Sequence, residues 1–97
     1  MKSYRLSNKA VIDLRNISRY TSIEFGQAQA KAYLTALKET TLQLAEQPQM
    51  AQLVNEVRTG YRRYLFQKHA IYFVEKDYGV YVVRVLHQQI RVELHLR

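Results

Sequence analysis

The residues best suited to acid–base chemistry are His87 and Arg84, three positions apart in an apolar stretch near the end of the chain. An imidazole titrates near neutral pH, and a guanidinium stabilises a phosphate as negative charge develops. With Arg63, they would suit a ribonuclease in which His87 is the general acid or base. However, Arg84 and His87 should face opposite sides of a regular strand, and no Asp or Glu is placed to pair with His87. A histidine at a strand end is more commonly a structural hydrogen-bonder.

A second group of candidate residues is basic and aromatic. It consists of Arg58, Tyr61, Arg62, Arg63 and Tyr64. Cations interleaved with aromatic rings are typical of surfaces that bind nucleic acid. Alternation along a strand sends Arg62 and Arg63 to opposite faces, so at most part of the group acts together. Tyrosine is also an ordinary strand residue, so a structural role stays open.

From these two groups we predict no catalytic residue, but we predict a set of residues that bind a partner. They are Arg58, Tyr61, Arg62, Arg63, Arg84 and His87.

The chain contains no cysteine, which excludes a disulfide framework, a thiolate nucleophile and a cysteine zinc site. It matches no phosphate-binding loop, dinucleotide fingerprint or nucleophile elbow. We therefore expect no cofactor, no metal and no small-molecule substrate.

The length of 97 residues predicts one domain spanning 1–97, because no linker composition divides it. Polar and charged residues near the N-terminus predict no signal peptide, and no apolar run is long enough for a membrane helix. We expect a cytoplasmic protein. The net charge is +7, and residues 58–97 carry eight Lys and Arg but three Asp and Glu. This imbalance indicates an acidic partner, either nucleic acid or a protein segment.

The second half of the chain must position these residues on a sheet. Residues 61–67, 69–75 and 80–87 are rich in Tyr, Phe, Val and Ile, and turn residues lie at 76–79. This pattern predicts a three-strand antiparallel meander. In the last strand, alternation places Val80, Val82, Arg84 and Leu86 on one face. Both faces are mostly apolar, so this strand should be central, with Arg84 reaching a neighbour such as Glu75 or the chain end.

The first half predicts a cover for that sheet. Residues 4–6 suit an edge strand, and Ser7 suits a helix N-cap. Apolar residues at helical spacing predict one helix that ends at Gly26 and a second over 27–46, before Pro48. Residues 49–57 should form a connection from which Met50, Leu53, Val54 and Val57 tuck under the helices. The predicted class is α+β: a short N-terminal strand and an antiparallel helical hairpin packed on a three- to four-stranded antiparallel sheet.

The order and spacing of many residues resemble the ParE branch of the ParE/RelE toxin superfamily. The resemblance covers nearly the whole chain and is densest in three segments. They are Arg58-x-Gly60-Tyr61-Arg62-Arg63, His69-x-Ile71-Tyr72-Phe73 and Arg84-Val85-Leu86-His87.

The resemblance implies the same fold, and a toxin held inactive by a cognate antitoxin whose C-terminal segment wraps it. From the basic charge and uncovered apolar surface of the chain, we expect that segment to be acidic and partly disordered. ParE members are associated with poisoning DNA gyrase. RelE members are ribosome-dependent mRNA endonucleases, which is the alternative function, with Arg63, Arg84 and His87 as its candidate residues. Two departures stand out: Ile90-Arg91 replace the usual Met-Asp pair, and Ala51 replaces a common glycine.

Overall fold

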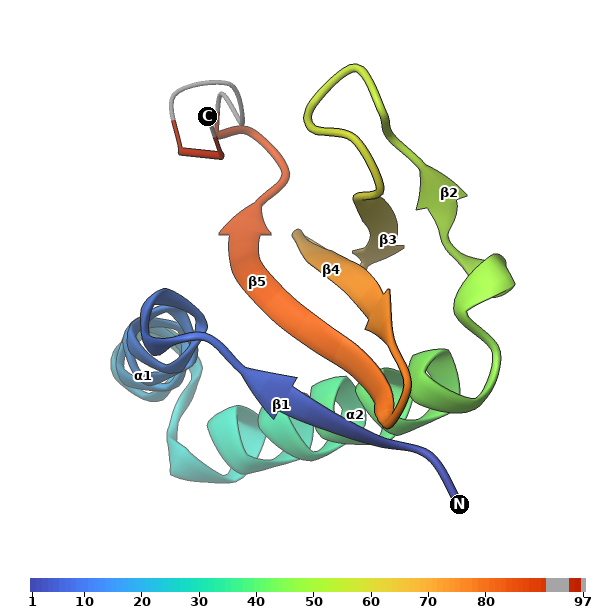
Figure 1. Cartoon of the computed structure of the whole chain (residues 1–97). Coiled ribbons are helices and arrows are strands. Elements are labelled where there is room, and N and C mark those ends of the chain that lie inside the picture. Colours follow the sequence, from blue (N-terminus) through green and yellow to red (C-terminus); the bar gives the residue numbers. More distant parts are fainter. Residues whose placement is uncertain (91–94, 97) are drawn as a thin grey trace.

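A computed structural model describes residues 1–90, 95 and 96 of the chain (Figure 1). Its elements are β1 (Ser3–Leu6), α1 (Asn8–Phe25), α2 (Gln27–Glu46), a short 3-10 helix (Pro48–Met50), β2 (Gln52–Leu53), β3 (Arg62–Phe66), β4 (His69–Lys76) and β5 (Gly79–His87). The predicted helical hairpin and the meander of β3, β4 and β5 are both confirmed. No helix within this described part of the chain is long and apolar enough to cross a membrane.

The sheet has five strands in the order β1-β5-β4-β3-β2. The neighbours from β5 to β2 pair antiparallel, whereas β1 pairs parallel with β5, with Tyr4 opposite Val80. The α+β class was therefore predicted correctly, but the sheet is mixed and has one strand more than expected. A parallel pair needs a long crossover, and here the helices and strands between β1 and β5 supply it.

The ends of α1 follow the predicted signals. The Ser7 side chain accepts a hydrogen bond from the backbone N–H of Ala10 at 3.0 Å, which caps the helix. Gly26 has φ +92°, a backbone angle that favours glycine, and it separates α1 from α2. The two helices lie together on one side of the sheet (Figure 1).

The main core lies between the helices and one face of the sheet. It is built from apolar residues of both layers: Ala10, Ile17, Leu37, Leu44, Ala45, Ala51, Ile71, Phe73, Val80, Val82 and Val85. A smaller cluster on the other face joins the sheet to the 54–60 loop and the chain end. It contains Ala70, Tyr72, Leu86 and Leu96, with Val57, Tyr61 and Val83 packed against it. Strand β5 thus lies inside the sheet, between β1 and β4, and apolar clusters cover both of its faces, as predicted.

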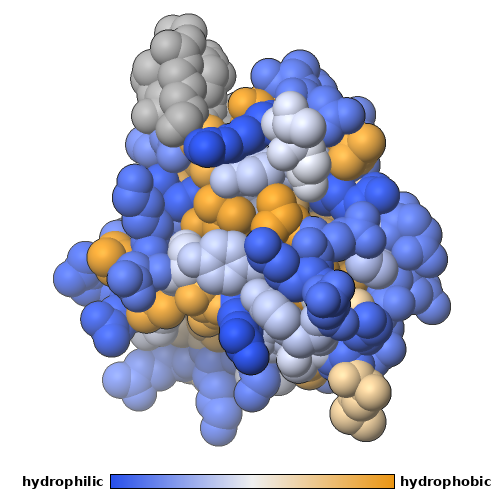
Figure 2. All heavy atoms as spheres, in the orientation of Figure 1, coloured by the Kyte–Doolittle hydropathy of each residue, from blue (hydrophilic) through white to orange (hydrophobic). Residues whose placement is uncertain are grey.

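The connection after α2 only partly fulfils its prediction. Val54 is fully buried, but Met50 and Leu53 are 42% and 46% exposed. These two residues lie on the short 3-10 helix and on an edge strand of two residues, at the rim of the sheet. On the face shown in Figure 2, hydrophobic residues form patches surrounded by hydrophilic ones.

A β-bulge in β5 overturns the predicted side-chain alternation. Phe73 pairs with Val82 but Tyr72 pairs with Arg84, which leaves Val83 as an extra residue. An extra residue reverses the order of faces beyond it. Val82 and Val85 therefore both face the helices, although they are an odd number of positions apart.

Candidate functional site

An ion pair fastens α1 to the edge of β5 immediately after the bulge. The guanidinium of Arg84 donates to the Asp13 carboxylate at 2.8 and 2.9 Å, and the backbone N–H of Val85 donates to it at 3.0 Å. The side chains of Arg84 and Asp13 are only 14% and 11% exposed. Hydrogen bonding to Asp13 raises the pKa of Arg84 above its ordinary value, which is already high. The predicted partners, Glu75 or the chain end, were wrong, because α1 brings Asp13 to the edge that β1 leaves open beyond Val82.

The bulge also sets the surroundings of His87. Continuing the register of the β4–β5 turn would place Leu86 opposite His69, but the extra residue places His87 there. The two imidazole rings meet edge to face, with centroids 5.5 Å apart. On the helix side, the Tyr33 hydroxyl lies 2.7 Å from Nδ1 of His69. We call Tyr33, His69 and His87 the histidine cluster.

The histidine cluster is partly withdrawn from water. Burial, followed by the neighbouring His87, lowers the pKa of His69. Burial likewise raises the pKa of Tyr33. Nδ1 of His87 accepts from the backbone N–H of Gln89 at 3.2 Å, which fixes that ring against the chain following β5. The expected structural hydrogen bonding of His87 is thus present.

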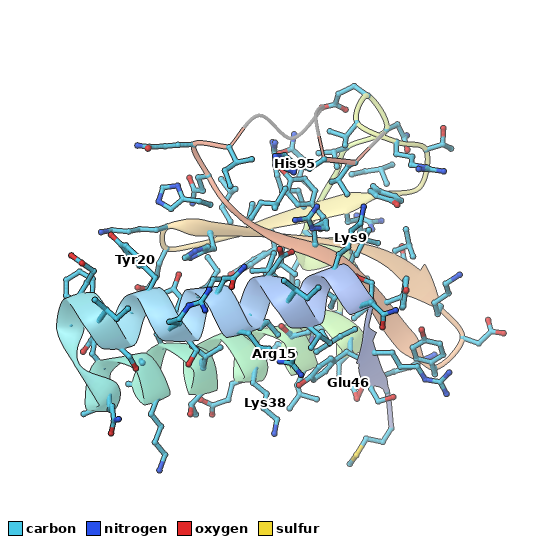
Figure 3. All side chains as sticks on the ribbon, turned by 90° about the vertical axis from the view of Figure 1, so that its left-hand side faces the viewer. Lys9, Arg15, Tyr20, Lys38, Glu46 and His95 are labelled. Atoms are coloured by element: carbon cyan, nitrogen blue, oxygen red, sulfur yellow. The ribbon has the colours of Figure 1, made fainter. Side chains whose placement is uncertain are left out.

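Two adjoining surface hollows meet at the histidine cluster. One, of about 340 Å³, is lined by Tyr20, Phe25, Tyr33, His69 and His87 among others, and we call it the aromatic hollow. The other, of about 310 Å³, is lined in part by Asp13, Arg84, His87, Ile90 and His95. Figure 3 labels Tyr20 toward the C-terminal end of α1.

The second hollow corrects a prediction about Arg84 and His87. Their odd spacing was expected to keep them apart, yet both line this hollow. The reason is that the Arg84 head turns to Asp13 at the open edge of β5. Ile90, which stands where the family usually has Met, is 41% exposed and also lines it, whereas Arg91 lies outside the described residues.

The remaining arginine candidates are divided between the faces of the sheet, as alternation predicted. Arg62 lies opposite Phe73 in the β3–β4 register and therefore on the face of the main core. Its side chain donates to Glu75 at 3.0 Å and to the Ala51 carbonyl at 2.8 Å. Arg63 lies opposite Tyr72 in the same register and therefore on the face of the smaller cluster, and its side chain donates to Gln52 at 3.4 Å.

Arg58 and Tyr61 remain together on the side of the sheet that carries the smaller cluster. The Arg58 guanidinium carbon lies 6.0 Å from the centroid of the Tyr61 ring, at the limit of a cation–π contact. Arg58 is exposed, and Tyr61 packs against the smaller cluster. These two are therefore available for a partner in a way that Arg62 and Arg84 are not.

The three residues proposed for a ribonuclease do not converge. Arg63 is drawn to Gln52 on β2, whereas Arg84 is drawn to Asp13 beside β5, at the other side of the sheet. Residues 1–90, 95 and 96 contain no group of three or more His, Asp or Glu side chains arranged to hold a metal ion.

Sequence reasoning missed Asp13, Tyr33 and His69 as members of this site. Asp13 and Tyr33 lie on helical faces, where neither type stands out from a structural residue. His69 did carry a signal, because it and His87 occupy the ends of two strands joined by a short turn. Recognising their contact would have required knowledge of the bulge.

Comparison with known proteins gives a consistent result along the chain. The family model described as ParE toxin of type II toxin-antitoxin system, parDE, matches residues 4–92. Toxin ParE1 of Caulobacter vibrioides is 38% identical over 96 residues, which cover 99% of each chain. Toxin ParE1 of Mycobacterium tuberculosis is 33% identical over 94 residues, which cover 96% of each chain.

A solved structure shares the fold. It is titled "Chromosomal ParDE TA system from P. aeruginosa", and it matches with a TM-score of 0.76 at 18% sequence identity. The match covers 90% of the present chain and 96% of the other.

Proposed function

Because this chain belongs to the ParE toxin family of type II toxin–antitoxin systems, we propose that it arrests growth by binding and inhibiting DNA gyrase. In this proposal it acts in the cytoplasm as a protein inhibitor and not as a nuclease. Membership of the family implies a cognate antitoxin that neutralises it.

The inhibitor proposal rests on one observation: the arginine side chains that a nuclease would need already interact with other residues of the protein. Arg84 is held by Asp13, and Arg63 reaches toward the far side of the sheet. Both guanidinium groups would have to abandon these contacts to act on one phosphate. A protein-binding role makes no such demand.

Exposed apolar side chains supply a surface for a macromolecular partner. On the last turns of α1, Tyr20, Ile23 and Phe25 are 64%, 73% and 60% exposed. Tyr20 and Phe25 also line the aromatic hollow, beside His87. Large apolar side chains gathered at one end of a helix are typical of protein–protein contacts. This surface would suit the amphipathic segment of the antitoxin.

A supercoiling assay tests the gyrase proposal. Purified toxin should inhibit supercoiling of relaxed plasmid by gyrase, and it should increase the amount of cleaved plasmid trapped with the enzyme. A stoichiometric excess of antitoxin should restore supercoiling. Supercoiling that proceeds unchanged at saturating toxin, with no trapped cleavage, would refute the proposal.

The antitoxin surface is tested with charged substitutions at exposed positions. Ile23→Lys and Phe25→Lys should weaken binding of the partner encoded next to this gene, because each places an ammonium group in an apolar contact. Leu65→Lys is a matched control, since Leu65 is 56% exposed on β3, away from α1. If calorimetry gives the same affinity for all three variants, the exposed apolar end of α1 is not the surface that binds the antitoxin.

A further inference from the structure

The side of the sheet that carries the smaller cluster also has a basic hollow that the proposed function does not use. It has a volume of about 490 Å³ and lies among the start of α1, the 54–60 loop and strands β4 and β5. Lys9, Arg58 and Lys76 contribute its cations, and Tyr61 and Tyr81 contribute aromatic rings. We call this set of five residues the basic hollow.

The charges of the basic hollow are uncompensated at the site. Its three cationic residues are exposed, and no Asp or Glu is among the residues that line it. Arg62 and Arg84 differ, because Glu75 and Asp13 neutralise them. Three like charges that converge from separate segments raise the local positive potential, which attracts a polyanion.

We propose that the basic hollow binds the phosphodiester backbone of nucleic acid. Each phosphate that a Lys or Arg neutralises releases condensed counterions, which favours binding without regard to sequence. A guanidinium also matches the oxygens of a phosphate in geometry. The aromatic rings favour nucleic acid over an acidic peptide, because an unpaired base, at a duplex end or in a single strand, can pack on them.

The start of α1 adds to the attraction at this site. Ser7, Asn8 and Lys9 all line the hollow, and the first turn of α1 contains no acidic side chain. The positive end of the helix dipole therefore acts in the same direction as the three cations.

The basic hollow is separate from the surface proposed for the antitoxin. Asn8 and Phe25 are the first and last of the 18 residues of α1, so 17 rises of about 1.5 Å separate them by about 25 Å. Nucleic acid and antitoxin would thus contact different ends of the same helix. The inference does not depend on gyrase being the target.

Binding is tested by fluorescence anisotropy without gyrase, so that failure of the two proposals can be told apart. The probes are a labelled DNA duplex and an RNA duplex of the same length, titrated with toxin at several salt concentrations. We expect binding to DNA, with an affinity that falls linearly as log K against log salt. Tighter binding to the RNA duplex at equal salt would mean that the ligand of the basic hollow is RNA and not DNA.

Substitutions locate the site. Lys9→Gln, Arg58→Gln and Lys76→Gln should each reduce the salt slope by about 0.9, and the triple variant by about 2.7. Lys38→Gln is the matched control for Lys9→Gln, since both are exposed helical lysines. Figure 3 shows Lys9 on the sheet side of α1 and Lys38 on the far side of the helical layer.

The outcomes decide the proposal directly. Removing a cation from the first turn of a helix does not weaken the helix, so Lys9→Gln should keep the unfolding midpoint of the parent. The proposal is overturned if DNA does not bind at low salt, or if Lys38→Gln lowers the slope as much as Lys9→Gln. It is also overturned if polyglutamate competes as well as DNA at equal charge, because the site would then suit acidic protein.

Discussion

Asp13 on α1 holds Arg84 on β5 through two hydrogen bonds of 2.8 and 2.9 Å, across 71 residues of sequence. The same carboxylate also accepts from the backbone N–H of Val85. The Asp13 side chain thus supplies a hydrogen-bond acceptor to the edge of β5 beyond Val82, where β1 no longer pairs with it. The pair joins the two layers of the fold, and the Asp13 carboxylate balances the charge that Arg84 keeps.

Breaking this pair should destabilise the fold strongly. Asp13→Ala leaves a mostly buried guanidinium and a backbone N–H without their acceptor, so we expect a loss of about 3–5 kcal/mol in the free energy of unfolding. Urea denaturation measures it. Glu75→Ala is the control, because Glu75 is 55% exposed and its pair with Arg62 should contribute about 0.2–1 kcal/mol. Equal losses would contradict the role given to Asp13.

A side chain at position 79 should detach β1. A Cβ added to Gly79 would lie 1.8 Å from the Ser3 carbonyl oxygen, and its φ is +142°. Gly79→Ala should therefore cost more than the roughly 1–3 kcal/mol of a strained backbone angle alone. Gly60→Ala isolates that strain, because φ is +85° there and an added Cβ meets nothing within 4 Å. Hydrogen exchange of the Ser7 backbone N–H, which donates to the Val82 carbonyl on β5, should rise only in the Gly79 variant.

The low pKa of His69 should make stability depend on pH. The unfolded chain binds a proton at His69 near its ordinary pKa of about 6.5, whereas the folded protein binds it only at lower pH. The stabilisation is therefore complete above about pH 6.5 and is lost as the pH falls toward the folded pKa. In the His69→Gln variant, the urea midpoint should change less between pH 7.5 and pH 5.5 than it does in the parent.

Removing the hydroxyl that contacts His69 should have a smaller effect. Tyr33→Phe keeps the ring that packs edge to face on Phe66 and His69 but deletes the 2.7 Å hydrogen bond. We expect a loss of about 0.5–1.5 kcal/mol in the free energy of unfolding. A double-mutant cycle with His69→Gln should show coupling, and simple additivity would mean that the bond contributes nothing.

Growth arrest should survive substitution of the most tempting catalytic residue. If the toxin acts as a protein inhibitor, His87→Gln should still arrest growth when it is expressed without antitoxin. A ribonuclease that uses His87 as its general acid or base would lose about 10²–10⁴-fold in rate. A folded His87→Gln variant that no longer arrests growth would favour the ribonuclease alternative.

The parts of the fold that follow from local signals were open to prediction. Ser7 and Gly26 mark the ends of α1, and the second helix was predicted over 27–46, the range it occupies. Apolar periodicity depends on neighbours three or four positions away for helices and two for strands. The meander likewise needs only short turns, so its three strands could be placed.

Features that depend on distant contacts were decided by the tertiary structure. Val83 follows an identical valine, Val82, so nothing local marks it as the extra residue of a bulge. That one residue brings His87 opposite His69 and places Val85 on the helix side. The partner of Arg84 also lies 71 residues away, on a helix whose position depends on packing. Local patterns therefore placed the helices and strands, whereas long-range packing determined which side chains meet.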